Sequence, residues 1–186
     1  MLSQLHNQTA DRFCSNWSTH NTHISNKRRV FQSEMVVNRA LSEKCRDGEV
    51  QQVKEALANG ADPNSTDDGG VFSFQSTLLM IAVLKYRVEV VDLLLATDGI
   101  DVNIKRTDGR TALHLAIYSA SWGMDTHPII IKLLGAPGIN VNALDNLNHT
   151  PIMVALKDGR TEAVRLLAPV ANLDCKFPGG QSLEER

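Results

Sequence analysis

The segment Thr111-Ala112-Leu113-His114-Leu115-Ala116 decides the fold, because its pattern of threonine, alternating aliphatic residues and alanine occurs three times in the chain. The other two copies are residues 77–82 and 150–155. A second apolar segment follows each copy, at residues 88–95, 128–134 and 161–167. Apolar residues three and four positions apart give each segment one buried helical face, so the pattern predicts pairs of helices.

Turn sequences of the form Gly-x-Asp/Asn-x-Asn close the first copies, and their last asparagines are residues 64, 103 and 142, which are 39 apart. A copy without the threonine precedes the other three, at residues 41–48 and 49–57. Gly48 and Gly159 lie between paired helices, where a left-handed residue can end the first helix. One pair of helices cannot bury its own apolar face, so neighbouring pairs are expected to stack.

Residues 111–116, with Asp108-Gly109 just before them, closely resemble the T-P-L-H-x-A signature of ankyrin repeats. The resemblance covers about residues 40–176 and implies an all-α solenoid of about four helix–turn–helix units with short finger loops. We expect repeats at about 36–67, 68–106, 107–144 and 145–176. Residues 1–35 are expected to be a polar, disordered leader and residues 177–186 a C-terminal tail.

The sequence departs from the repeat pattern at several positions. The first copy has Arg39 in place of the threonine and is expected to be an N-terminal cap. Tyr86 replaces a glycine between paired helices. The repeat period of this chain exceeds the period of about 33 residues that is usual for ankyrin repeats. We therefore expect insertions, and the extra residues fall around residues 69–74 and within residues 119–127. The fourth copy is expected to be the C-terminal cap or a site of truncation.

Composition excludes several classes of protein. The chain has 186 residues, 42% hydrophobic and 5% aromatic, so its core must consist of Leu, Val, Ile and Ala. A net charge of −2 gives no electrostatic argument for nucleic acid, and no apolar run is long enough for membrane insertion. Three sparse cysteines fit a reducing compartment. We therefore expect the protein to be located in the cytoplasm or the nucleus, or in the host cytosol if it is a pathogen effector. We also expect it to be a monomer.

No catalytic string accompanies the repeats. The sequence contains none of the dinucleotide-binding, P-loop, nucleophile-elbow or zinc-protease motifs. We therefore predict that the protein is not an enzyme and binds no cofactor. Cys14, His20 and His23 lack a fourth zinc ligand, and polar disordered sequence is the preferred interpretation. Lys27-Arg28-Arg29 is interpreted as a solvated run rather than an import signal.

Two groups of residues have roles that the resemblance implies. His114 is expected to hydrogen-bond neighbouring turns, and Thr77, Thr111 and Thr150 are expected to cap helices. The context of Asn103 is similar to that of ankyrin asparagines that are hydroxylated, and Asn142 is a weaker candidate. The alternative that we favour is a turn asparagine that bonds its own backbone.

The resemblance implies that a protein partner binds the concave face formed by fingers and first helices. Leu144 and Leu147 are apolar at a finger tip, and Tyr118 and Trp122 flank an insertion, as interface anchors often do. For Trp122, Phe72 and Phe74, the alternative that the insertions bury their own aromatics stays open. Ser119 also lies at an expected first-helix end and is expected to be exposed on this surface. The predicted partner-binding residues are Arg46, Leu84, Lys85, Lys105, Asp108, Arg110, Tyr118, Trp122, Leu144, Asn146, Leu147, His149 and Lys157.

The predicted function is a non-enzymatic protein–protein interaction module. The alternative is an effector or regulatory protein in which residues 1–39 carry the activity and the repeats localise it. A zinc-dependent or hydrolytic enzyme is the third, less favoured class.

Overall fold

The computed structural model describes residues 37–67, 74–119 and 125–172. The chain divides into two units, Met1–Val37 and Asn38–Arg186, and the helices described below belong to the second, apart from Val37 at the start of the first helix. The leader, Trp122, Phe72 and the Cys14–His20–His23 group lie outside the described residues. The predictions made for them, and the exact limits of the repeats, stay predictions.

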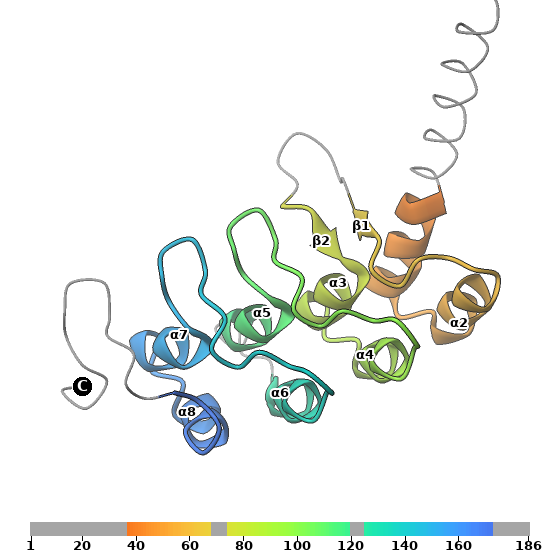
Figure 1. The fold of residues 1–186 in the computed structure, drawn as a ribbon. Coiled ribbons are helices and arrows are strands. Elements are labelled where there is room, and N and C mark those ends of the chain that lie inside the picture. The colour runs from red at the N-terminus through yellow and green to blue at the C-terminus, as the bar shows by residue number, and fades with distance from the viewer. Residues whose placement is uncertain (1–36, 68–73, 120–124, 173–186) are drawn as a thin grey trace, which may run out of the picture. The chain divides into compact units, whose positions relative to one another are not determined.

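Successive helix pairs form two rows (Figure 1). The first row begins with the helix of residues 37–47, and the second row begins with α2 (Val50–Ala58). The first row continues with α3 (Leu78–Leu84), α5 (Ala112–Ser119) and α7 (Pro151–Lys157), and the second with α4 (Val88–Leu95), α6 (His127–Leu134) and α8 (Thr161–Leu167). Helices α3 and α4, α5 and α6, and α7 and α8 contact each other within their pairs, and from α2 and α3 onward each helix also contacts the equivalent helix of the next described repeat, as far as α7 and α8. In Figure 1 the fingers rise from the first row, on the side away from α4, α6 and α8. This arrangement is the predicted all-α solenoid.

Local sequence sets the ends of these helices. The hydroxyl of Thr77 accepts a hydrogen bond from the amide of Met80 at 3.3 Å, and Thr150 does the same for Met153 at 3.4 Å. These two predicted caps are confirmed, and each satisfies an amide that has no partner within the helix. Gly48 has φ +84° between the first helix and α2, a conformation that glycine adopts without strain.

Aliphatic side chains fill the space between the helices, as the composition predicted, and two methionines that it did not predict, Met80 and Met153, are buried with them. Leucine, isoleucine and methionine make up all the largest fully buried side chains of the described residues, among them Leu94, Leu113 and Ile130. Ser119 is also buried, and its hydroxyl donates to the carbonyl of Leu115 at 2.8 Å. The expectation of a surface position for Ser119 was therefore wrong, because its side chain folds back onto the preceding helical turn.

Asparagines at the 39-residue period join one repeat to the next. The Asn103 side chain donates to the carbonyl of Gly138 at 2.8 Å and accepts from the amide of Asn140 at 2.7 Å. Asn64 makes the equivalent bonds to Gly99 and Asp101. The expectation that Asn103 bonds its own backbone was wrong, because this side chain spans the gap between two turns. Its hydroxylation stays a prediction.

The first finger differs from the others at its base. Strands β1 (Thr66–Asp67) and β2 (Ser76–Thr77) pair in an antiparallel arrangement, with Thr66 opposite Thr77. Phe74 follows the part of the finger that is not described and lies at the edge of the next finger, where its carbonyl accepts from the amide of Thr107 at 3.2 Å.

Candidate functional site

The second finger is a tight hairpin whose shape depends on Asp108. The amide of Arg106 donates to the carbonyl of Arg110 at 2.9 Å, and the amide of Gly109 donates to the carbonyl of Arg106 at 2.8 Å. The Asp108 carboxylate accepts from Nε of Arg106 at 3.0 Å, from its terminal Nη2, and from the amide of Arg110 at 3.2 Å. One carboxylate therefore fixes the hairpin and one arginine side chain together.

The electrostatics of Asp108 agree with this geometry. Partial burial acts to raise the pKa of its carboxyl. Hydrogen bonds from the Arg106 side chain and the Arg110 backbone, together with the two guanidinium charges, outweigh burial and hold the pKa below its ordinary 3.8. Asp108 is therefore ionised at neutral pH and stays bound to Arg106.

Hydrogen bonds also join the second finger to the third. The amide of Asn146 donates to the carbonyl of Asp108 at 3.1 Å, and its side chain donates to the carbonyl of Thr107 at 2.8 Å. Nζ of Lys105 donates to the carbonyl of Leu144 at 2.8 Å. These bonds fix the spacing between the two fingers.

Gly109 allows this close approach. Its φ is +78°, and a Cβ at this position would lie 2.5 Å from the amide nitrogen of Asn146 and 2.9 Å from the carbonyl carbon of Asp145. Neither backbone atom can move without breaking the finger contact. The Asp108-Gly109 dipeptide is thus required both for the turn and for finger packing.

Two arginines lie over aromatic rings at the base of the fingers. The guanidinium carbon of Arg106 is 4.3 Å from the ring centroid of Phe74, and that of Arg110 is 5.0 Å from the centroid of Tyr118. Such cation–π contacts contribute about 0.5–1 kcal/mol at exposed sites. They orient both arginines along the surface instead of leaving them free in solvent.

The third finger carries a buried carboxylate. The Asp145 side chain is 1% exposed and accepts from the amides of Leu147 at 2.9 Å and His149 at 2.8 Å. Its other oxygen lies 3.8 Å from Nε of Arg110 and 3.7 Å from Nδ1 of His149. Asp145 shapes its own finger and holds Arg110 between two fingers.

His114, on helix α5, also connects the second finger to the third. Nδ1 accepts from the amide of Thr111 at 3.2 Å, so the neutral ring carries its proton on Nε2, which donates to the carbonyl of His149 at 3.1 Å. Burial is the main cause that lowers the pKa of His114 below 6.5. The predicted structural role of His114 is confirmed. Thr111 contacts this ring through its amide and its hydroxyl.

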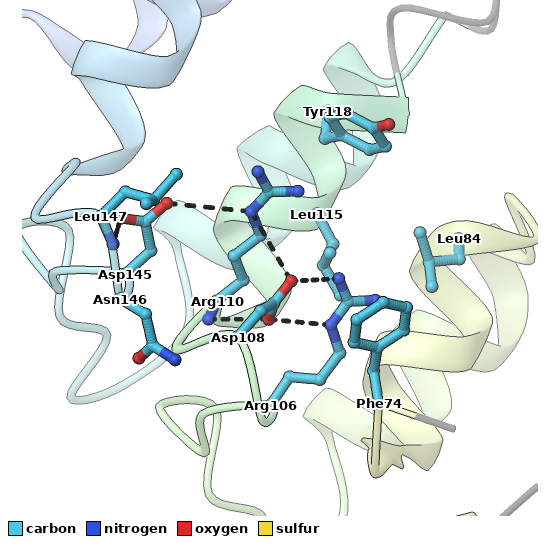
Figure 2. A pocket seen from close by; sticks show the side chains of 10 residues that line it. All are labelled: Phe74, Leu84, Arg106, Asp108, Arg110, Leu115, Tyr118, Asp145, Asn146 and Leu147. Atoms are coloured by element: carbon cyan, nitrogen blue, oxygen red, sulfur yellow. Dashed lines mark hydrogen bonds and ion pairs between the residues drawn. The ribbon is translucent and has the colours of Figure 1, made fainter. Parts of the chain in front are cut away.

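These elements surround a cavity of about 470 Å³, shown in Figure 2, which we call the finger cavity. Leu115 is buried beneath it, and Leu84 at the end of α3 is half-buried. Phe74 is 53% exposed, Tyr118 36% and Leu147 60%. The finger cavity is lined by Phe74, Leu84, Arg106, Asp108, Arg110, Leu115, Tyr118, Asp145, Asn146 and Leu147.

The structure brings part of the predicted partner-binding set together. Six of these residues line the finger cavity: Leu84, Asp108, Arg110, Tyr118, Asn146 and Leu147. Others lie outside its lining, namely Lys85, Lys105, Leu144, His149, Arg46 and Lys157. Arg46 forms an ion pair with Asp67 at 3.0 Å at the base of the first finger. Trp122 lies outside the described residues.

Sequence reasoning missed Arg106 and Asp145 and left Phe74 undecided. The alternative that the insertion buries its aromatics is wrong for Phe74, which is over half exposed. The sequence did contain a signal for Arg106, because an arginine two residues before an aspartate, here Asp108, can reach the aspartate carboxylate. Asp145 carried none beyond its place in a turn sequence.

The described residues show neither a metal cluster nor a membrane span. Among them, no three His, Cys, Asp or Glu side chains lie close enough to hold a metal ion. None of the helices built from them is both long and apolar enough to cross a membrane.

Comparisons with known proteins agree with the repeat architecture. Residues 41–145 match the family described as ankyrin repeats in three copies. The chain is 33% identical to protein lin-12 of Caenorhabditis elegans over 129 residues, which are 68% of this chain and 8% of that protein. It is 36% identical to Rabankyrin-5 of Mus musculus over 76 residues, which are 41% of this chain and 6% of that protein. The chain thus spans a small part of the length of either relative. From the repeated helix pairs, the joined fingers and the family match over more than half of its length, we conclude that the chain belongs to the ankyrin-repeat family.

Proposed function

We propose that this chain is a non-enzymatic module that binds a protein partner on its concave face, with the finger cavity at the centre of the contact. Ankyrin repeats generally serve as protein–protein interaction modules, and the family is typically non-enzymatic.

One observation carries the proposal: Phe74, Tyr118 and Leu147 expose apolar side chains around a single cavity. Exposed apolar groups that gather around a hollow are typical of interaction sites, because a partner that covers them removes apolar area from water. Aromatic anchors in pockets also dominate the energy of many interfaces.

Rigidity of the fingers supports the same surface. Asp108, Asn146 and Lys105 join adjacent fingers through backbone carbonyls, so the cavity walls are already ordered in the free protein. A receptor ordered before binding loses little conformational entropy when its partner docks. The free energy gained from burying Tyr118 and Leu147 is then available for affinity.

The experiment compares two variants of the full chain in affinity capture followed by mass spectrometry. In the test variant, Arg110, Tyr118, Leu144 and Leu147 are changed together to Ala. The matched control changes Ile131, Val170 and Arg165 to Ala, of which Ile131 is 55% exposed on α6 in the second row of helices.

We expect the test variant to lose the proteins that the wild-type chain captures and the control to retain them. Circular dichroism checks that both variants remain folded. Retention of the same proteins by a folded test variant, or their loss from the control alone, would refute the proposed surface.

A further inference from the structure

The finger cavity has hydrogen-bond donors left over after its internal contacts are made. Arg110 contacts Asp108 and Asp145 through Nε, at 3.8 Å each, and lies over the ring of Tyr118. Its two terminal nitrogens make no hydrogen bond or ion pair with any residue that the structure describes, and Figure 2 draws none from them. A guanidinium has five N–H donors in a planar fork, so the residues that the structure describes leave most of the donors of Arg110 unused.

Most acceptors of the cavity are already engaged. Asp108 accepts three hydrogen bonds from Arg106 and the backbone of Arg110. Asp145 is almost fully buried and accepts two backbone amides. The cavity therefore offers unused donors and few unused acceptors, and a complementary occupant must supply an acceptor.

Apart from Asn146 and the hydroxyl of Tyr118, the rest of the lining is apolar. Leu84, Leu115 and Leu147 lie with Phe74 around the two arginines. The volume of about 470 Å³ lies within the usual range for ligand sites, about 300–1,000 Å³, and is large enough for side chains of an extended segment.

We infer that the finger cavity recognises an extended segment of the partner that carries an aspartate or glutamate within two positions of an apolar side chain. The carboxylate receives the free edge of the Arg110 guanidinium, a planar bidentate pairing that arginine makes better than lysine. The apolar side chain covers Leu84, Leu147 and the Phe74 ring. This inference rests on the proposed function, because it names the chemistry of the segment that would bind there.

The test is selection of 12-residue peptides from a random display library on the full chain. We expect enriched peptides to contain Asp or Glu within two positions of Leu, Met, Phe, Trp or Tyr. A hydrogen bond to a charged group contributes about 1.5–3 kcal/mol. Changing the acidic residue of a selected peptide to its amide should therefore weaken binding about 10- to 100-fold, measured by fluorescence anisotropy.

A double-mutant cycle assigns that loss to Arg110. Against the Arg110→Gln chain, the amide substitution in the peptide should weaken binding less than about threefold, since the partner charge is gone. Arg165→Gln on α8 removes the same kind of side chain from the second row and should leave the full effect. If Arg110→Gln fails to fold, the substitution in the peptide still decides, because it leaves the protein unchanged.

Several results would overturn the inference. Enriched peptides without acidic residues, or an amide substitution with no effect, would remove the role of the carboxylate. Self-association of the full chain that Tyr118→Ala abolishes would place a second copy in the cavity. Tighter peptide binding after Glu184→Gln and Glu185→Gln would place the chain's own C-terminal residues there.

Failure of this inference can be separated from failure of the proposed function. If no peptide is enriched but the four-residue Ala variant still loses its captured proteins, the concave face binds a folded partner and only the acidic segment is wrong. If neither experiment responds to changes in the cavity, the proposed function fails as well.

Discussion

Gly109→Ala should destabilise the protein far more than the same change at another left-handed glycine. Gly109 has φ +78°, and the added Cβ would lie 2.5 Å from the amide nitrogen of Asn146 and 2.9 Å from the carbonyl carbon of Asp145. Gly138 has φ +74° and no atom within 4 Å of the equivalent Cβ. The two positions therefore share the backbone strain, and only Gly109 adds the collision between fingers.

The expected magnitudes follow from these two terms. A residue with a Cβ in the left-handed region lowers the free energy of unfolding by about 1–2 kcal/mol relative to glycine. At Gly138 this backbone strain is the whole expected loss. At Gly109 the fingers must also separate, which breaks the bonds from Asn146 to Asp108 and to Thr107. At about 1 kcal/mol for each hydrogen bond, the total at Gly109 is about 3–4 kcal/mol.

Urea denaturation of the full chain, followed by circular dichroism, measures both variants against the wild type. We expect the free energy of unfolding to fall about 2 kcal/mol further for Gly109→Ala than for Gly138→Ala, the equivalent of the two lost hydrogen bonds. Equal losses of unfolding free energy for the two variants would refute the argument, because they would mean that an added Cβ at Gly109 does not collide with the third finger.

Three further predictions concern the buried groups and the ladder between repeats. Because burial lowers the pKa of His114, the unfolded state binds its proton more readily; the unfolding free energy should decline as the pH falls below 6.5, and His114→Gln should flatten that slope in urea titrations at successive pH values. Burial raises the pKa of Cys45 to about 12, so in a chain with Cys14→Ser and Cys175→Ser a thiol reagent at pH 8 should react only after urea unfolds the protein; prompt labelling would contradict the burial. Asn103→Ala removes two hydrogen bonds to the next turn and should lower the unfolding free energy by about 1–3 kcal/mol, a loss that a urea midpoint equal to that of the wild type would exclude.

The helix pairs could be predicted from sequence because their signals are local. The threonine caps at Thr77 and Thr150 act within one helical turn, and the aliphatic faces repeat every three or four residues. The 39-residue spacing of Asn64 and Asn103 also indicated that each repeat has an equivalent turn. Each of these features depends on neighbours in the sequence or on a fixed period.

The arrangement within the finger cavity could be predicted only in part. The exposed positions of Tyr118 and Leu147 follow from their places at a first-helix end and a finger tip. The contact of Arg106 with Phe74, and of Arg110 with Asp145, depends on how neighbouring fingers align in space. That alignment is set by backbone hydrogen bonds between residues more than 30 positions apart, which no local pattern records.

Site-specific photo-crosslinking tests the central claim, that a partner docks on the concave face, most directly. Benzoylphenylalanine is placed in the full chain at Tyr118 or Leu147 beside the finger cavity, and at Ile131 on α6 as the control. We predict that positions 118 and 147 crosslink to the captured partner and that position 131 does not. Crosslinking from position 131, with none from the two cavity positions, would contradict the account.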